Sequence, residues 1–170
     1  MIALLALVVA LVVPLAAARA PDCAPPTAPA SAVQVGLTTH GRQVGGLGIA
    51  AIDDTTWSLS LLAPAGFELF TISGPPATVA TGLEAWRPWL EKLPVERDLR
   101  LAFTPTAAGG ACRAPGGTLR ATPTETGWTR RWCGKGGGAT AVRDGDRVTL
   151  TDKRRGYTLT LILSEPDAPR

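Results

Sequence analysis

Apolar and polar side chains alternate along several short stretches of the chain. From Thr55 to Leu62, Trp57, Leu59 and Leu61 fall on one side and two serines on the other, which is typical of a strand with one buried face. The same reasoning predicts eight further strands, at 42–52, 67–73, 77–81, 118–122, 127–133, 139–143, 147–152 and 157–163. Short turns join most neighbours, including the hairpin signal Asp144-Gly145, so these strands should pair antiparallel.

A helical period separates the first four strands from the last five. Trp86, Trp89, Leu90 and Leu93 lie at i, i+3, i+4 and i+7, which places them on one helical face. Pro88 should open this helix at its first turn or bend it, and a second short helix is predicted over 94–103. Because the apolar helical face must be buried, we expect it against the concave side of the sheet. The predicted fold is therefore α+β, a curved antiparallel half-barrel of about nine strands plugged by one or two short helices.

The first 20 residues predict a secretory signal peptide. The run from Ile2 to Val13 holds no polar residue, and Ala18-Arg19-Ala20 supplies a small-x-small cleavage site. A retained membrane anchor is the alternative, although the run is short for a span. Residues 21–32 are rich in Pro and Ala and predict a flexible tether. The folded domain is placed at 33–164, followed by a polar tail at 165–170.

Three cysteines follow the signal. An oxidising compartment permits disulfides, and Cys112 and Cys133 flank a predicted hairpin, so we expect these two to be bridged. Cys23 is then left over. It lies where a bacterial lipoprotein would be acylated, but Asp22 before it is a poor match to such a site. Acylation of Cys23 and an unpaired cysteine in a loose tail both remain open.

Composition and motifs argue against an enzyme. Removal of Arg19 with the signal leaves 16 basic residues against 14 acidic ones, a net charge too small to indicate nucleic acid. His40 is the single histidine, and a surface histidine is a likelier role for it than a catalytic one. We therefore expect no catalytic residue, no metal site and no cofactor.

The order of elements resembles the half-barrel carriers and receptors of the bacterial lipoprotein-localisation (Lol) pathway, and most closely the outer-membrane receptor LolB and LolB-like lipoproteins. The likeness is carried by three short stretches: 57–70, where a strand ends in a Pro-x-Gly turn and the next begins at once, Leu93-Pro94 followed by 98–103, and the closing strand at 156–161. The receptor carries a bulky apolar residue on its protruding turn, whereas Ala65 occupies the matching position here.

The resemblance implies an apolar cavity for acyl chains. The residues that would line it share the inward faces of the strands and the helix: Trp57, Leu59, Leu61, Phe67, Leu69, Trp86, Trp89, Leu90 and Leu93. On the residues alone, a filled core explains the same pattern equally well. Two basic clusters on strands predicted to be neighbours, Arg130 with Arg131 and Arg154 with Arg155, would contact anionic head groups or form a solvated rim.

These observations favour a non-catalytic, exported protein of the bacterial cell envelope, periplasmic or outer-membrane-associated. It would bind a lipid or the acyl chain of a lipoprotein and aid lipid or lipoprotein localisation, with possible membrane association. The alternative is an envelope scaffold with a solid core that binds a protein partner.

Overall fold

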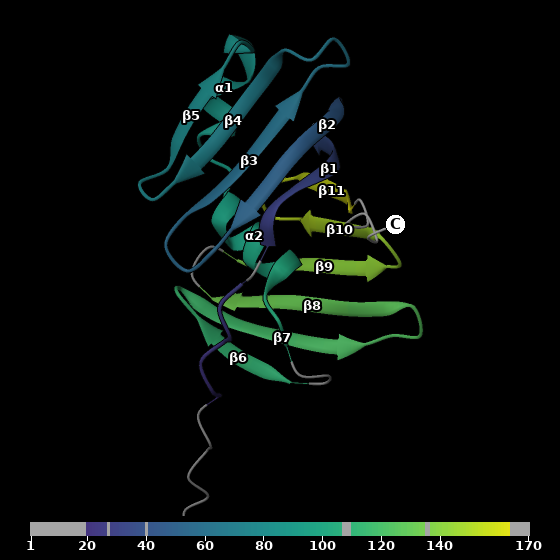
Figure 1. The fold of residues 1–170 in the computed structure, drawn as a ribbon. Coiled ribbons are helices and arrows are strands. Elements are labelled where there is room, and N and C mark those ends of the chain that lie inside the picture. The colour runs from purple at the N-terminus through teal and green to yellow at the C-terminus, as the bar shows by residue number, and fades with distance from the viewer. Residues whose placement is uncertain (1–19, 27, 40, 107–109, 135–136, 164–170) are drawn as a thin grey trace, which may run out of the picture.

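The computed structural model describes residues 20–26, 28–39, 41–106, 110–134 and 137–163. Within these ranges the chain forms one antiparallel sheet of eleven strands, in the order β5-β4-β3-β2-β1-β11-β10-β9-β8-β7-β6. The chain starts in the middle of the sheet and meanders outward to β5. It then crosses the concave side in a helical segment and meanders back from β6 to β11 (Figure 1). The pairing of β1 with β11 joins the two halves.

The first half of the sheet holds β1 (Ala28–Thr39), β2 (Arg42–Ile52), β3 (Trp57–Leu62), β4 (Glu68–Gly74) and β5 (Thr78–Thr81). The second half holds β6 (Ala111–Ala114), β7 (Gly117–Pro123), β8 (Gly127–Gly134), β9 (Ala139–Asp144), β10 (Arg147–Asp152) and β11 (Tyr157–Leu163). The two edge strands, β5 and β6, have four residues each. Short edges offer little template for pairing with another chain.

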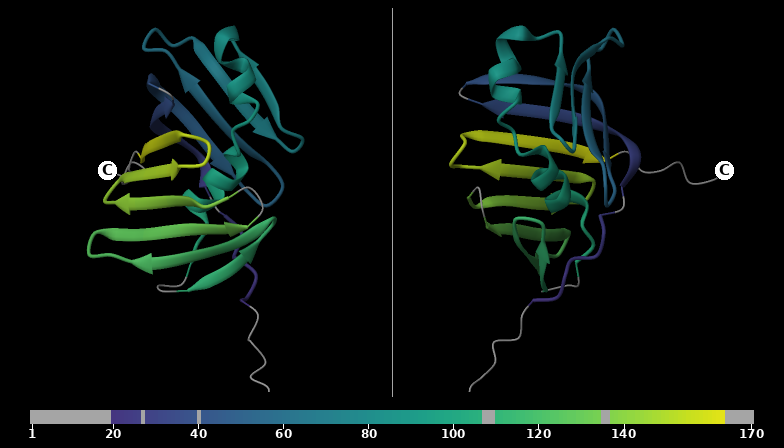
Figure 2. Two further views of the ribbon diagram at one scale, coloured as in Figure 1. Left: turned by 180° about the vertical axis from the view of Figure 1, so that it is seen from behind. Right: turned by 90° about the vertical axis from the view of Figure 1, so that its left-hand side faces the viewer.

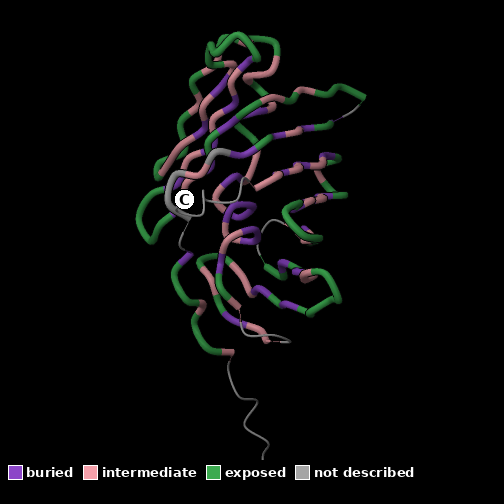
Figure 3. Tube along the Cα trace, turned by 45° about the vertical axis from the view of Figure 1, so that its right-hand side comes forward, coloured by how far each residue is buried: buried purple, intermediate pink, exposed green. Residues whose placement is uncertain are grey.

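Alternation along the strands gives the sheet one buried face (Figure 3). In β3, Trp57, Leu59 and Leu61 are buried, while the residues between them are partly exposed. Tyr157, Leu159 and Leu161 repeat this pattern in β11. At the β9–β10 hairpin Asp144 pairs with Arg147, and Gly145 has a φ of 59°, a conformation that glycine adopts without a steric penalty.

Three short helical segments lie between the two strand groups: a 3-10 turn η1 (Glu84–Trp86), α1 (Arg87–Leu90) and α2 (Val95–Phe103). Pro88 occupies the first turn of α1, where its missing N–H breaks no helical bond. Figure 2 shows α2 on the concave side of the sheet, with α1 near β5. Val95, Leu99, Leu101 and Ala102 of α2 belong to the core.

The predicted fold class is wrong. The structure is nearly all-β, with eleven strands rather than nine and only short helices. The two strands that the prediction lacks are β1 and β6. β1 begins inside the segment predicted as a tether, and β6 lies between the helix predicted at 94–103 and the strand predicted at 118–122, where no element is predicted. Both are flanked by Pro, Gly and Ala, which depress the strand signal.

Most of the predicted signal peptide lies outside the described residues, as does the predicted tail. Among the residues that are described, no helix is both long enough and apolar enough to cross a membrane.

Candidate functional site

A buried ionic cluster fastens α2 to the sheet. Arg97 Nε and Nη2 donate to Asp98 Oδ1 at 2.9 and 2.7 Å, and Arg97 Nη1 donates to Asp152 Oδ2 at 2.9 Å. The hydroxyl of Tyr157 donates to Asp98 Oδ2 and accepts from Arg97 Nη2 at 2.8 Å. Asp98 is only 2% exposed. Because breaking a buried pair leaves an uncompensated charge, these contacts hold α2 firmly against β10 and β11.

Burial and ion pairing shift the pKa values of the groups in this cluster. Burial raises the pKa of Asp98, and the Arg97 guanidinium opposes this effect. Burial raises the pKa of Tyr157, and the nearby Asp98 carboxylate adds to the effect. Burial alone would also raise the pKa of Asp152, but hydrogen bonds from the Arg155 N–H and from Arg97 outweigh it and lower that pKa. At neutral pH Tyr157 is therefore a protonated donor, and Asp152 is an ionised acceptor.

A second buried arginine holds the other end of α2. Arg130 Nη1 donates to the carbonyl oxygens of Leu101 and Ala102 at 2.8 and 3.0 Å. Carbonyls in the last turn of a helix have no partner within the helix and lie at its negative end. The Arg130 guanidinium lies 3.7 Å from the ring centroid of Trp128, within cation–π range. Burial lowers the pKa of Arg130 to about 10, with a smaller contribution from Arg143. Both ends of α2 are thus anchored by charged hydrogen bonds.

The attachment of α1 is different in kind. Trp86 packs edge-on against Trp89 with ring centroids 5.6 Å apart, and Trp89 packs edge-on against Tyr157. Both indoles are only partly buried, whereas Leu90 is fully buried. The ion pair between Arg87 and Glu84 is exposed, so it contributes little. Apolar contacts therefore carry most of the attachment of α1.

Most of the predicted cavity residues face the concave side. Trp57, Leu59, Leu61 and Leu90 lie in the core cluster, and Trp86, Trp89, Leu93 and Leu69 pack against it with partial exposure. The structure thus brings these strand and helix residues into one packed cluster.

The assignment of β4 is wrong by one residue. Phe67 is 60% exposed and precedes β4, while Phe70 and Ile72 are the residues of that strand that enter the core. A register shift between Leu61 and Leu62 marks an irregularity where β3 meets β4. An extra residue at such a point makes the residues that follow it switch from one face of the sheet to the other. Alternation counted from Phe67 therefore assigns the wrong residues of β4 to the core.

The predicted head-group arginines have different environments. Arg131 and Arg154 are exposed, but Arg130 is buried as a cap of α2, and Arg155 donates to Asp152 Oδ2 at 3.0 Å. β9 separates β8 from β10 in the sheet order. The prediction of two solvent-facing clusters on neighbouring strands is therefore wrong, since two of the four residues serve buried or paired roles.

The predicted disulfide is also wrong. Cys23 is bonded to Cys112, and Cys133 is a free, exposed cysteine. β7 lies between the strands of Cys112 and Cys133, so the two are about 10 Å apart and point to opposite faces, which excludes a bridge. The bond also occupies the Cys23 sulfur, so this form of the chain has no thiol for acylation there. A disulfide is consistent with an exported protein in an oxidising compartment.

The Cys23 bond attaches the N-terminal segment to the edge of the sheet. The Cys23 N–H donates to the Arg113 carbonyl, and the Arg113 N–H donates to the Pro21 carbonyl, both at 2.7 Å. Asp22 forms an ion pair with Arg113 at 3.2 Å. The start of the predicted tether therefore pairs with β6 and covers part of its open edge.

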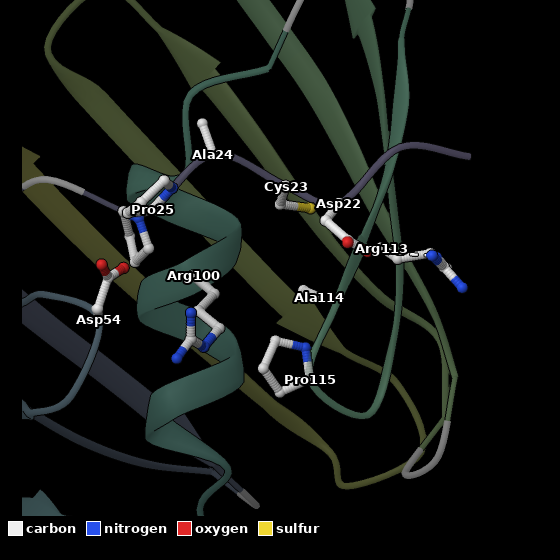
Figure 4. Close-up of a pocket in the computed structure, with 10 residues that line it drawn as sticks. Asp22, Cys23, Ala24, Pro25, Asp54, Arg100, Arg113, Ala114 and Pro115 are labelled. Atoms are coloured by element: carbon white, nitrogen blue, oxygen red, sulfur yellow. Dashed lines mark ion pairs between the residues drawn. The ribbon is translucent and has the colours of Figure 1, made fainter. Parts of the chain in front are cut away.

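Two adjoining hollows border α2. The larger, about 590 Å³, lies between residues 22–26, the β6–β7 turn and Arg100. Figure 4 shows Arg100 projecting from α2 among Pro25, Asp54 and Pro115. The smaller, about 140 Å³, lies at the beginning of α2 and shares Arg100 and Pro115 with the first. The sequence gives no signal for either hollow, because their walls come from segments far apart in the chain.

No catalytic arrangement emerges from the described part of the chain. His40 lies outside the described residues. Among those described, no three His, Cys, Asp or Glu side chains are grouped as they would be around a metal ion.

Comparison with protein families gives one result. The model of a family described as a protein of unknown function, DUF3261, matches residues 31–164, which is most of the chain and includes the whole predicted domain. The chain belongs to the DUF3261 family. No curated protein matches the chain. The family is uncharacterised, so its membership defines the domain without assigning it an activity or a relation to the Lol receptors.

Proposed function

We propose that this protein is a non-catalytic, exported binding protein of the bacterial cell envelope that holds an acyl chain of a lipid or lipoprotein between α1 and the concave face. We place it in the periplasm or at the outer membrane. The observation that carries the proposal is the unequal attachment of the two helices. α2 is held by buried ionic hydrogen bonds at both ends, whereas α1 is held mainly by apolar contacts.

The chemistry of α1 suits exchange with an acyl chain. Trp86 and Trp89 present partly buried rings to the concave side, and an apolar chain can replace their contacts with similar ones. Burying each methylene contributes about 0.8 kcal/mol, so a long chain offsets the loss of a few ring contacts. Lifting α1 breaks no buried charge pair, since the cluster of Arg97 lies on α2.

Phe67 suits delivery of the ligand to a membrane. It is exposed beside the β3–β4 turn, two residues after Ala65. In the Lol receptor that the sequence resembles, a bulky apolar residue on this turn aids transfer to the membrane. Phe67 supplies a large apolar side chain close to the place where Ala65 lacks one, and aromatic rings favour the membrane interface.

Binding is tested with palmitate that carries a nitroxide, which quenches tryptophan fluorescence when it is bound. We expect saturable quenching by the wild type and at least tenfold weaker binding by Trp86→Glu. Val142→Glu is the matched control, because Val142 is 42% exposed on the outer face of β9. Equal binding by all three proteins, with the fold retained in circular dichroism, would refute the site beneath α1.

A separate measurement addresses delivery. Transfer of the bound palmitate to phospholipid vesicles should slow at least fivefold in Phe67→Glu, while its affinity in solution stays that of the wild type. If transfer is unchanged, Phe67 has no role in delivery. The proposal of acyl binding beneath α1 is then decided by the quenching experiment alone.

A scaffold with a solid core is the second candidate. Leu59, Leu61, Phe70 and Leu90 are at most 1% exposed, which fits a core that is already filled. The outer face supplies exposed apolar groups for a partner, among them Leu47 and Ile49. Absence of quenching by palmitate, together with capture of a defined envelope protein that Leu47→Glu abolishes, would favour this function.

A further inference from the structure

The smaller hollow beside α2 has an unusual balance of charge. Three guanidinium groups and one carboxylate line it, from Arg97, Arg100, Arg155 and Glu96. Asp98 and Asp152 are not among its lining residues, although they pair with Arg97. Arg155 also pairs with Asp152, so the balancing carboxylates of Asp98 and Asp152 lie behind the guanidinium groups that line the hollow. A ligand that accepts hydrogen bonds from guanidinium groups is the one that this lining favours.

Two donors at the hollow have no acceptor in the described part of the chain. Trp132 lines the hollow and is 2% exposed, yet no hydrogen-bond partner meets its Nε1. Arg100 uses Nε to bond Glu96 Oε1 at 3.0 Å, and no described acceptor bonds its Nη1 or Nη2. A buried donor without a partner destabilises the fold. An acceptor-rich ligand would satisfy the Arg100 fork directly, and it would reach Trp132 Nε1 after a shift of the side chains that bury this atom.

The beginning of α2 adds to this field. The cap residue Pro94 has no side-chain oxygen, and no side-chain hydrogen bond caps the first turn of this nine-residue helix. The first amides of a helix point outward and carry partial positive charge, which is the arrangement that binds phosphate groups in many proteins. Pro94 and Glu96, both from this end of α2, line the same hollow.

We propose that this hollow binds a phosphate group. Its volume of about 140 Å³ exceeds by about tenfold the space that a single water needs. A tetrahedral phosphate directs acceptors to several sides, toward the Arg100 fork, the Trp132 indole and the start of α2. A planar carboxylate would reach fewer of them, and arginine forks match phosphate oxygens in pairs. The phosphate belongs to a soluble phosphate compound or to a lipid head group.

This site does not depend on the acyl-binding proposal. Its donors come from α2 and β8 and the turn after β10, whereas the acyl site involves α1 and the seam beneath it. Either proposal can therefore be refuted without the other, because different variants test the two sites.

Isothermal titration calorimetry tests the phosphate site with two probes at constant ionic strength. One probe is inorganic phosphate, and the other is dihexanoyl phosphatidic acid below its critical micelle concentration. Arg100→Gln removes the free fork, and Trp132→Phe removes the N–H while keeping an aromatic ring. Arg120→Gln is the matched control, because it removes one exposed arginine of β7 on the outer face.

We expect at least tenfold weaker binding in Arg100→Gln and in Trp132→Phe, and unchanged binding in Arg120→Gln. Binding of inorganic phosphate with this dependence assigns the site to soluble phosphates. The same dependence with the lipid probe alone assigns it to a head group. Failure of both probes to bind, or equal binding by the wild type and both site variants in their folded state, would overturn the proposal.

Discussion

The indole of Trp89 packs edge-on against the phenol ring of Tyr157, with ring centroids 6.3 Å apart and planes inclined by 82°. The hydroxyl of the same Tyr157 donates to Asp98 in α2. One residue of β11 thus contacts both helices, α1 through its ring and α2 through its oxygen. The ring contact is the weaker of the two, because an aromatic pair adds only about 0.5–1.5 kcal/mol beyond its burial.

Trp89→Ala should therefore loosen α1 without releasing α2. We expect amide hydrogens of residues 87–93 to exchange at least tenfold faster, while those of α2 keep their protection. Hydrogen exchange followed by mass spectrometry measures both segments in one experiment. Equal acceleration in the two helices would show that they open as a single unit, contrary to their unequal attachment.

The buried cluster predicts a strong coupling between Arg97 and Asp98. Arg97→Met or Asp98→Leu alone should each lower the free energy of unfolding by about 3–5 kcal/mol, because each leaves a buried charge without its partner. The double variant should lose much less than the sum of the two. Urea denaturation of the four proteins gives the coupling energy, and strictly additive losses would argue against a direct buried pair.

The Cys23–Cys112 disulfide spans 89 residues of sequence. In the chain-entropy account a loop of this length stabilises the fold by about 4–5 kcal/mol, so Cys112→Ser should lower the free energy of unfolding by up to that amount. Cys133→Ser is the control, since this exposed thiol is free, and should leave stability unchanged. A peptide map that links Cys112 to Cys133 would contradict the pairing.

Asp53 provides a test of pH dependence. Its carboxylate accepts hydrogen bonds from the backbone N–H groups of Thr56 and Thr55 and from both hydroxyls. The backbone bonds are the main cause that lowers its pKa from 3.8 to about 2. A lowered pKa means that Asp53 stabilises the fold above pH 3.8 and loses this contribution as the pH falls to about 2. Titration by NMR should give this pKa, and a value near 4 would contradict the turn geometry.

The sequence predicts those parts of the fold that depend on neighbouring residues. The alternation of Trp57, Leu59 and Leu61 needs only one buried face, and the hairpin at Asp144-Gly145 needs only a two-residue turn, so both predictions are confirmed. The pairing of β1 with β11 brings Val35 to Leu161. Pairing between segments so far apart in the chain produces no local sequence pattern. The sequence therefore does not predict β1, whose first residues are rich in Pro and Ala.

The candidate sites are less accessible to sequence reasoning. Arg97 and Asp98 are charged residues of a short predicted helix, and nothing local indicates that they are buried. Their contacts with Asp152 and Tyr157, more than fifty residues later, make them a buried cluster. The alternation of β8, by contrast, is enough to exclude the predicted disulfide between Cys112 and Cys133. In β8 a buried Trp132 places its neighbour Cys133 on the opposite face, away from Cys112.

Native mass spectrometry of the protein purified from the envelope fraction of an exporting host tests the central claim most directly. Our account predicts a mature chain that carries lipid under native conditions, loses it on denaturation, and is two hydrogens lighter than the reduced chain because Cys23 and Cys112 are joined. The Trp86→Glu variant, prepared in the same way, should carry none. A wild-type chain that is folded, disulfide-bonded and free of lipid would contradict acyl binding and favour the scaffold.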